Sequence, residues 1–480
     1  MKLVRQFLAT LLFSSLLAAK PNILFIAVDD LRPELNCYGA SHIHSPNIDA
    51  LAQRGTLFER AYCQVAVCGA SRASIMTGLR PETTRCWTYY TPMREKNPDA
   101  LSLPQHFKNH GYTTLSFGKI YHATNDDYPL GWSEKPLKEK GSTYASQENL
   151  NALKKLAQQN NEKERLRGPS HENPGNLPDN VYADGTITEK SIARLEQLAA
   201  ADTPFFLAVG FQKPHLPFNA PGKYWEIYDP EKIKTPSSED RLNGIPHATS
   251  FWGELKSYPD IPSNRKVLSP EKSRTLIHGY YACVSYIDSL IGQLLNSLDR
   301  LSLSNNTIIV LWGDHGFYLG EFGDWCKHTN YEVATHVPLI ISTPGGKPNQ
   351  RTPALTEFVD VFPTLADLAG LPIPPQLQGT SLTPLLENPS RTWREAAFSQ
   401  YEKNKRGVGL VLGTSVRTHR FRYTEWRRKD NPSILEDISL IDFQTDPKAL
   451  KNIAQDPQYA THIKHLAELA KSSRTGLKPN

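Results

Sequence analysis

The sequence lacks the features that mark several protein classes. Its 480 residues include only six cysteines, too few for a small disulfide-rich scaffold, although an even count in an exported chain leaves room for three disulfides. Lys and Arg number 54 against 49 Asp and Glu, a net charge of +5, and no block of basic residues interrupts this balance. We therefore expect no nucleic-acid partner.

Long hydrophobic runs are absent beyond the N-terminus, since no later stretch approaches the ~20 apolar residues of a transmembrane helix. At the N-terminus, Lys2 and Arg5 precede a short apolar run over residues 7–17. Small and polar residues follow it, so we interpret residues 1–19 as a secretory signal peptide. The sequence thus predicts an exported protein, periplasmic or secreted, that has no membrane partner after signal removal.

The residues that are present suit a large globular protein, with 39% apolar and 10% aromatic residues. Short apolar runs rich in β-branched and aromatic residues alternate with helical patterns. The runs cover residues 22–28, 112–117, 204–211, 307–312 and 338–342. This alternation predicts an α/β fold with a large, mostly parallel sheet between layers of helices.

Helical patterns lie between the runs. One helix is predicted from Ser45 and Pro46 to Gly55, and others over residues 188–200 and 274–301. Residues 135–180 are polar and charged, and we interpret them as a surface insertion.

The pattern changes near residue 390, where alternating strands are followed by a final helix at about residues 460–471. This favours an antiparallel sheet with a helix as a second subdomain. The predicted organisation is a catalytic domain over residues 20–390 and a smaller C-terminal subdomain over residues 391–480.

Reactive side chains follow four of the five apolar runs. They are Asp29 and Asp30, Lys119 and His122, Lys213 and His215, and Asp314 and His315. Taken singly, each could be a helix cap or a solvated loop residue. Ligands of open α/β sheets bind beyond the carboxyl ends of the strands, so the coincidence at four strand ends favours one shared site.

The acidic members of this group point to a metal ion. Three neighbouring aspartates would repel one another unless a cation lay between them. The oxygen donors Asp29, Asp30 and Asp314 suit Ca²⁺ or Mg²⁺, whereas an imidazole ligand from His315 leaves Zn²⁺ or Mn²⁺ open.

The basic members describe a pocket for an anion. Lys119, Lys213 and Lys327, together with His122 and His215, would surround an anionic ester, and one imidazole could act as general acid to the leaving oxygen. These residues predict a metal-assisted hydrolase of a charged ester. They leave sulfate and phosphate esters open.

A cysteine in the segment AVCGASRASIMTGLRP carries a further hypothesis. We expect Ser71 to cap a helix that runs from Arg72 to Gly78, so that the thiol of Cys68 faces the positive helix end beside a guanidinium. Both features would lower the thiol pKa. The alternative is a buried structural cysteine.

The same segment resembles a family signature. Cys-x-Ala-Ser-Arg followed by Thr-Gly is similar to the signature of the type I sulfatases, in which the cysteine is oxidised to formylglycine (3-oxoalanine). The segments VDDLRPELNCYG, GKIYH, FFLAVGFQKPHLPF and GDHGFYLGEFGDWCKH resemble the iduronate-2-sulfatase branch, and the resemblance runs in order over residues 21–453. It implies an alkaline-phosphatase-like fold and a sulfuric ester hydrolase.

The resemblance assigns metal ligands and a modified residue. Asp29, Asp30, Asp314 and His315 match the family ligands of one Ca²⁺ ion, and formylglycine made from Cys68 completes the set. In the family reaction, the hydrated aldehyde attacks sulfur, the alcohol departs, and the second hydroxyl expels sulfate.

The resemblance also assigns catalytic roles. Arg72 matches the residue that steadies formylglycine, and Lys119 and His122 match the pair beside it. His215 matches the proton donor to the leaving alcohol, and Lys327 matches the sulfate-binding lysine.

The implied partners are a formylglycine-generating maturation enzyme and a sulfated carbohydrate. Ala70 stands where the most familiar signature has Pro, so which maturation enzyme acts is open. The resemblance favours a 2-O-sulfate of a uronate-containing sugar. Candidate substrate-binding residues are Trp87, Tyr89, Tyr90, His328, Arg420, Arg422 and Trp426.

Two alternative functions stay open at this point. The first is a phosphate or phosphonate monoester hydrolase of the same superfold, because such a site also uses Asp and His metal ligands. The second is a non-catalytic sugar-binding protein, although binding alone would not need the whole set of reactive residues.

The cysteines can be sorted on this basis. If Cys68 is the catalytic precursor, five cysteines remain, and a framework of three disulfides fails. At most two disulfides are possible, and none is required.

Overall fold

A computed structural model of the protein describes residues 20–122, 127–139, 143–159, 167–237, 240, 242–249, 252–262, 264 and 267–474. An eight-stranded sheet lies at its centre, in the order β10-β2-β11-β7-β1-β5-β3, with β12 beside β2. The strands are β1 (Asn22–Val28), β2 (Thr56–Tyr62), β3 (Thr113–Gly118), β5 (Phe205–Phe211), β7 (Thr307–Gly313), β10 (His336–Val337), β11 (Leu339–Ser342) and β12 (Gln350–Glu357).

The sheet is mostly parallel, which confirms the predicted fold class. Strands β3, β5, β1 and β7 are parallel to one another, and β12 is parallel to β2. Strand β11 runs antiparallel to both β7 and β2. The predicted strands lie within one residue of the observed ones, because apolar runs of this length are buried on both faces of the sheet.

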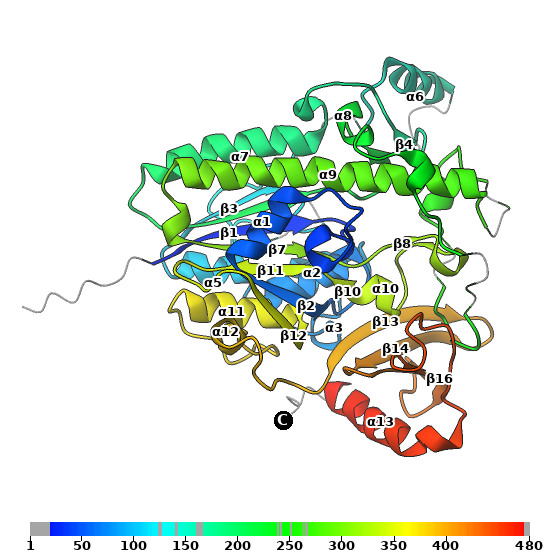
Figure 1. Ribbon diagram of the computed structural model, residues 1–480. Coiled ribbons are helices and arrows are strands. Elements are labelled where there is room, and N and C mark those ends of the chain that lie inside the picture. The colour runs from blue at the N-terminus through cyan, green and yellow to red at the C-terminus, as the bar shows by residue number, and fades with distance from the viewer. Residues whose placement is uncertain are drawn as a thin grey trace, which may run out of the picture.

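Helices cover both faces of the sheet (Figure 1). The side chains of β1 belong alternately to two hydrophobic cores, one on each face. Leu24 and Ile26 pack with α1 (Pro46–Arg54), α7 (Ala183–Ala199) and α9 (Pro270–Arg300). Phe25 and Ala27 pack with α2 (Cys68–Thr77), α5 (Leu103–Asn109) and α11 (Val361–Leu368). Successive side chains of a strand point to opposite faces, so one strand supports both layers.

The start of α2 differs from the sequence expectation. The helix begins at Cys68, with Val67 as its N-cap residue, whereas we expected Ser71 to cap it. Ser71 lies inside the helix, and its hydroxyl donates to the backbone carbonyl of Asp314 at 2.5 Å. The hydroxyl therefore links α2 to the residue that follows β7, and it does not cap the helix.

The other predicted helices are present with shifted starts. Helix α1 occupies the predicted span and ends before Gly55. Helix α7 begins five residues before the predicted start, and α9 begins four before it, where the Ser269 hydroxyl accepts from the backbone N–H of Lys272. A capping residue outside the periodic apolar pattern explains the shift of α9.

The polar insertion contains regular structure. Helix α6 (Gln147–Gln159) extends away from the sheet (Figure 1), and β4 (His171–Glu172) pairs in parallel with β6 (Phe218–Asn219). The remaining short elements are α3 (Pro81–Thr84), α4 (Met93–Lys96), α8 (Gly222–Trp225), α10 (Glu332–Thr335), α12 (Thr383–Glu387), β8 (Tyr318–Leu319) and β9 (Trp325–Cys326).

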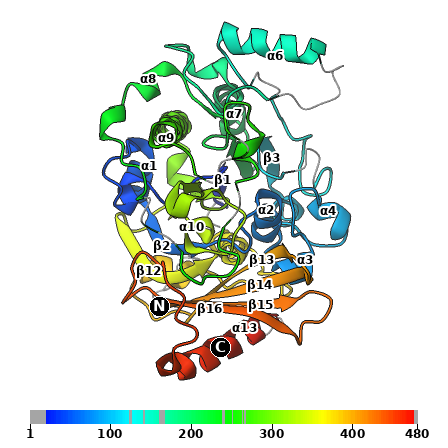
Figure 2. The ribbon, with the colours of Figure 1, turned by 90° about the vertical axis from the view of Figure 1, so that its right-hand side faces the viewer.

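The C-terminal part is an antiparallel sheet with a helix, as predicted. Its strands are β13 (Ala397–Lys405), β14 (Gly409–Arg417), β15 (Phe421–Arg428) and β16 (Leu435–Asp442), and they pair in chain order. Helix α13 (Ala460–Arg474) packs on this sheet through Leu466 and Ala470, and Figure 2 shows both beneath the larger part of the molecule. The domain boundary at residue 390 stays a prediction.

Buried polar contacts join this C-terminal sheet to the segment that follows β9. Glu332 accepts from Arg422 at 2.6 Å and from Arg417 at 2.9 Å. The Asn330 side chain donates to carbonyls of β13 and β14 at 3.2 and 3.1 Å. The same segment begins with Lys327, so the C-terminal sheet supports a loop of the predicted site.

Two expectations about the whole chain can be compared with the structure. All six cysteines lie in its described part, and none of them forms a disulfide. No helix among the described residues is long and apolar enough to cross a membrane. The predicted signal peptide, residues 1–19, lies outside the described residues.

Candidate active site

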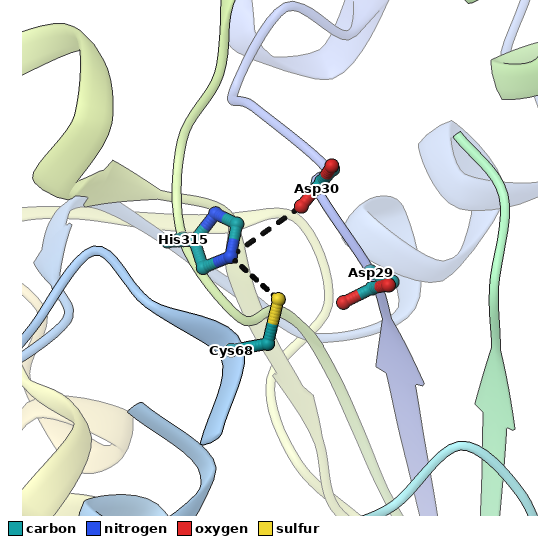
Figure 3. Close-up of side chains that lie close together, drawn as sticks. All are labelled: Asp29, Asp30, Cys68 and His315. Carbon is teal, nitrogen blue, oxygen red and sulfur yellow. Dashed lines mark hydrogen bonds and ion pairs between the residues drawn. The ribbon is translucent and has the colours of Figure 1, made fainter. Parts of the chain in front are cut away.

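The acidic and sulfur-bearing residues singled out in the sequence meet at one edge of the sheet. Asp29 and Asp30 follow β1, His315 follows β7, and Cys68 begins α2. One ligand atom from each of these residues lies within 4.8 Å of the others (Figure 3). All four residues are buried.

Asp314 completes this cluster through hydrogen bonds. Its Oδ1 accepts from the backbone N–H of Asp30 at 3.0 Å, and its Oδ2 accepts from Nε of Arg72 at 2.9 Å. The same Oδ1 lies 3.6 Å from Nε2 of His315. We call Asp29, Asp30, Cys68, Asp314 and His315 the floor of the site.

The backbone conformation of Asp30 places the carboxylates of Asp29 and Asp30 on the same side of the chain. Asp30 has a φ of 60°, in the left-handed region that few residues other than glycine adopt. This turn brings its side chain beside that of Asp29, although neighbours in a strand point to opposite faces. The hydroxyl of Tyr280 in α9 donates to the Asp30 carbonyl at 2.8 Å and holds the turn.

Three cations neutralise the floor carboxylates. Lys327 contacts both oxygens of Asp30 at 2.9 Å, Lys119 pairs with Asp29, and Arg72 lies 3.2 Å from Asp29. Burial opposes ionisation of Asp29, but the charges of Lys119, His215 and Arg72 outweigh it and hold the pKa of the carboxyl well below its usual range. Burial instead raises the pKa of Asp314, against the charges of His315 and Arg72.

The thiol of Cys68 is not activated in the way the sequence suggested. The residue is 4% exposed, and its Sγ lies 3.2 Å from Nε2 of His315. Burial and the charge of Asp29 raise the thiol pKa well above its usual value, against Lys119 and Lys327. The expected lowering is wrong, because the carboxylates lie on the side to which the thiol points.

The donor set fits a divalent cation. The Nδ1 of His315 lies 3.0 Å from the carbonyl of Gly316, so Nε2 is the ring nitrogen that faces the floor and is available as a ligand. Three carboxylates and one imidazole converge there, and such an oxygen-rich set suits Ca²⁺.

Opposite the floor, His215 is held between two acceptors. Its Nδ1 lies 2.6 Å from the carbonyl of Leu216, and its Nε2 lies 2.9 Å from Oε1 of Glu254. Burial opposes protonation, but Asp30 and Glu254 outweigh it and raise the pKa of His215. Because neither acceptor can donate, these contacts favour the doubly protonated ring, which is the form that a general acid requires.

Glu254 was missed by the sequence analysis. Its second oxygen, Oε2, lies 2.9 Å from Nζ of Lys327, so one carboxylate bridges the imidazole of His215 and this ammonium. Lys327 and His215 hold the pKa of Glu254 well below its usual range although the group is buried. The residue lies in a loop without a preceding strand or an apolar pattern, so no sequence signal marked it.

Lys213 has a different place from the one expected. It is 7% exposed, and its Nζ donates to the backbone carbonyls of His215 at 3.1 Å and Pro217 at 2.6 Å. The carboxylate of Asp184 in α7 accepts from the backbone N–H of Lys213 at 2.9 Å. Lys213 therefore braces the loop that carries His215 and does not line the pocket.

Lys119 and His122 reach the site through a close approach of two strands. A Cβ on Gly118 would lie 2.1 Å from the carbonyl oxygen of Gly210 in β5, so only glycine fits there. The backbone carbonyl of Lys119 accepts from Arg72. Burial and the charge of Lys119 lower the pKa of His122 to about 4, which leaves its ring neutral at pH 7.

Tyr89 belongs to a partly exposed loop beside the site. Its side chain is 39% exposed, and its ring centroid lies 5.5 Å from that of His122. The loop packs directly on the start of α2, since a Cβ on Gly69 would lie 2.8 Å from the Cα of Tyr89. Trp87, in the same loop, is half-buried and lies beneath Nζ of Lys429 at 5.5 Å.

His328 lies directly after Lys327 and is half-buried. Burial and the charge of Lys327 lower the pKa of the His328 ring to about 4. The backbone N–H of His328 lies 3.4 Å from the carbonyl of Ala66, two residues before Cys68.

The structure does not bring the C-terminal candidates to the site. Trp426 is 1% exposed and lies against His247 at 4.6 Å between ring centroids, so its ring offers no face to a substrate. Arg420, just before β15, forms an ion pair with Asp442 at the end of β16, with 2.6 Å between Nη2 and Oδ2. Arg422 is buried with Glu332. Packing within the C-terminal sheet buries Trp426 and Arg422 and so contradicts two of these expectations, whereas a substrate contact by the exposed Arg420 stays a prediction.

Comparison with known proteins agrees with this geometry. A family model described as "Sulfatase" matches residues 21–371, and one described as "N-sulphoglucosamine sulphohydrolase, C-terminal" matches residues 320–475. The chain is 34% identical over 511 residues to iduronate 2-sulfatase of Mus musculus, and the alignment covers 91% of each chain. The chain belongs to the sulfatase family. The predicted resemblance to its iduronate-2-sulfatase branch is confirmed.

Solved structures place this sulfatase in the expected fold. A protein solved with its substrate D-glucosamine-2-N,6-O-disulfate has a TM-score of 0.74 at 24% identity and covers 95% of this chain and 98% of its own. A phosphonate monoester hydrolase from Silicibacter pomeroyi has a TM-score of 0.73 at 26% identity and covers 95% of both chains. The alkaline-phosphatase-like fold and the sulfuric ester hydrolase activity predicted from the sequence are thus confirmed.

Proposed function

We propose that this sulfatase is an exported enzyme that removes a 2-O-sulfate from a uronate-containing poly- or oligosaccharide, using formylglycine made from Cys68. The observation that carries the proposal is the buried floor, where Cys68 lies beside three carboxylates and an imidazole. The similarity to iduronate 2-sulfatase supports the sugar and the sulfate position.

Two groups would complete the floor. Asp29, Asp30, Asp314 and His315 would hold one Ca²⁺ ion, and Cys68 would carry the aldehyde. Bound together, they would supply a hydrated aldehyde as the nucleophile and a Lewis acid for the sulfate oxygens.

The remaining residues have roles that follow from their positions. Arg72 donates to Asp314 and lies on α2 one turn after Cys68, so it orients the floor around the modified residue. Lys119 and Lys327 are the cations nearest the carboxylates and would neutralise sulfate oxygens. His215 carries a proton at Nε2 that it can give to the departing alcohol oxygen.

The substrate would enter beside the loop that carries Tyr89. Tyr89, beside His122, offers an exposed aromatic face to a sugar ring. Trp87 and the backbone of His328 both contact the segment that ends at Cys68, and we propose these two residues as further sugar contacts.

The decisive experiment combines mass spectrometry with substrate assays. The peptide containing Cys68 should have the mass of formylglycine, and the protein should release sulfate from 2-O-sulfated uronate oligosaccharides in a panel of defined sulfated sugars. Cys68→Ala, His215→Ala and Asp314→Ala should each abolish release while circular dichroism shows a folded protein. A wild-type rate in any of these variants would contradict the role assigned to that residue.

A phosphate or phosphonate monoester hydrolase is the second candidate. The likeness to the Silicibacter pomeroyi enzyme favours it, as does the number of cations around the floor, which could hold a dianion. Sulfate, phosphate and phosphonate esters of one phenol would be compared. An unmodified Cys68 together with phosphatase activity would overturn the sulfatase mechanism.

Export and maturation complete the proposal. We propose that residues 1–19 direct export to the periplasm or the medium and that a formylglycine-generating enzyme acts on Cys68. N-terminal sequencing of the mature protein after cell fractionation tests the first part. Co-expression with alternative maturation enzymes, with formylglycine content as the readout, tests the second.

A further inference from the structure

A basic residue of the polar insertion lies beside the site without a role so far. Arg167 precedes β4, and its guanidinium carbon lies 4.8 Å from the ring centroid of Tyr258. Tyr258 belongs to the same loop as Glu254, four residues further along the chain. The insertion and the Glu254 loop thus meet at Arg167.

The segment that carries Arg167 is firmly anchored. The backbone N–H and the hydroxyl of Ser170 donate to the carboxylate of Asp260 at 2.8 and 2.7 Å. The hydroxyl of Tyr144 donates to a carbonyl of the same segment at 2.7 Å, and a Cβ on Gly168 would lie 2.7 Å from the Tyr144 ring. These contacts fix the backbone from which the guanidinium projects.

The guanidinium has hydrogen-bonding capacity to spare. Its Nη1 is buried and has no hydrogen-bond partner among the described residues. The two oxygens of Glu254 are already engaged by His215 and Lys327. Stacking on Tyr258 uses the face of the guanidinium and leaves its in-plane N–H groups for another acceptor. A buried donor without an acceptor is costly, so the arrangement favours a ligand.

The position of Arg167 is at the mouth of the site. Burial raises the pKa of Tyr89 to about 12, with Glu254 adding to the rise and Arg167 opposing it. The same two charges act in opposite senses on Tyr258. Arg167 therefore lies near both tyrosines, and Tyr89 in turn contacts His122. The guanidinium thus lies against the loop that carries Glu254, whose carboxylate contacts both His215 and Lys327.

We propose that Arg167 binds a second anionic group of the substrate, a carboxylate or a further sulfate on the sugar that bears the scissile ester or on its neighbour. The inference rests on the proposed function. A guanidinium presents paired N–H donors that match the oxygens of a carboxylate or sulfate. Lys119 and Lys327 serve the scissile group, so Arg167 selects substrates that carry two anions.

The test compares three substrates in the full-length matured enzyme. They are an aryl sulfate with one anionic group, a 2-O-sulfated uronate disaccharide, and the same disaccharide with its carboxyl reduced to an alcohol. Arg167→Ala should lower kcat/KM on the uronate disaccharide by about 10- to 100-fold, mainly through KM. The loss on the aryl sulfate should be at least about fivefold smaller, since that substrate offers the guanidinium no partner.

The reduced disaccharide identifies the anion. If Arg167 binds a carboxylate, reducing the carboxyl should lower kcat/KM of the wild-type enzyme by the same factor as Arg167→Ala does on the intact disaccharide. For the Arg167→Ala variant, reducing the carboxyl should lower kcat/KM little further. A loss that instead follows removal of a second sulfate from a disulfated sugar assigns the subsite to sulfate. Arg167→Lys should bind the disaccharide more tightly than Arg167→Ala but less tightly than the wild type, because lysine restores the positive charge without the paired N–H donors of the guanidinium.

The controls separate failure of this inference from failure of the proposed function. Arg391→Ala removes an exposed arginine outside the site and should leave the substrate ratio at its wild-type value. Equal losses by Arg167→Ala on all three substrates, with an unchanged melting temperature, would overturn the subsite while the sulfatase function stands. A matured wild-type enzyme that releases sulfate from none of them would overturn the proposed function, and the subsite with it.

Discussion

The floor and the rim of the site are built by different means. The floor lies at the ends of β1 and β7 and at the first residue of α2, it is buried, and its carboxylates are paired with cations. The rim, which we define as Trp87, Tyr89, Arg167 and Glu254, comes from loops far apart in the chain. The difference teaches that rigid elements place the reacting groups, whereas loops set which substrate reaches them.

The largest effect is expected at the centre of the floor. Cys68→Ala should lower sulfate release by roughly 10⁵-fold, because the proposed nucleophile derives from this side chain. The melting temperature should change little, since alanine fits the start of α2. Substantial turnover by the alanine variant would show that the floor is not where the reaction occurs.

A second floor substitution tests the metal. Asp314→Asn keeps the shape of the side chain but removes a charge that faces Asp30, Arg72 and His315, and it should lower kcat by roughly 10³-fold. Calcium content is measured in parallel by atomic emission. Chelation of the wild type should reproduce the loss and added Ca²⁺ should reverse it, whereas a chelator-resistant wild type would contradict the proposed ion.

Glu254 connects rim and floor, so its removal should have an intermediate effect. Glu254→Gln should lower kcat by about 10- to 100-fold, because His215 and Lys327 lose the carboxylate that holds both. The pH profile of kcat is the readout, and its basic limb should move to lower pH as the imidazolium loses a stabilising charge. Glu395→Gln, which alters an exposed pair with His465, is the matched control. Identical profiles for the two variants would remove Glu254 from the mechanism.

A pure rim substitution should act on binding alone. Tyr89→Ala should raise KM for a sulfated disaccharide by about two- to tenfold, because a half-exposed ring contributes stacking without touching the reacting atoms. The value of kcat should remain within about twofold of the wild type. A fall in kcat that exceeds the rise in KM would place Tyr89 in the floor instead.

The smallest effect is expected outside both regions. Arg420→Ala should leave kcat/KM on the same disaccharide within about twofold of the wild type, since this side chain is paired with Asp442 on the C-terminal sheet. A change in KM comparable to that of Tyr89→Ala would mean that the rim extends to β15.

The sequence predicted that the floor residues lie together, but it singled out only Trp87 and Tyr89 of the four rim residues. Asp29, Asp30, Asp314 and His315 each follow an apolar run, and parallel strands necessarily carry such residues to one edge of the sheet. Glu254 has no such neighbour, so the sequence offered no reason to single it out.

Two errors have a related cause. The expected start of α2 and the expected direction of the Cys68 pKa shift both failed because of groups that approach from other strands. The Ser71 hydroxyl donates to the carbonyl of Asp314, just after β7. The charges of Asp29 and Asp314 raise the pKa of the Cys68 thiol. Local patterns do not contain this information, because each contact joins residues that are distant in the chain.

By itself, the sequence determined the α/β architecture, the C-terminal sheet, the family and the strand ends that carry the reactive groups. These follow from hydrophobic periodicity and from motifs in which position along the chain implies position in the fold. Only the tertiary structure decided how each charge is partnered, that Trp426 is buried, that Glu254 contacts His215, and that Arg167 stacks on Tyr258. Electrostatic balance and burial are sums over neighbours from the whole chain, and folding alone brings those neighbours together.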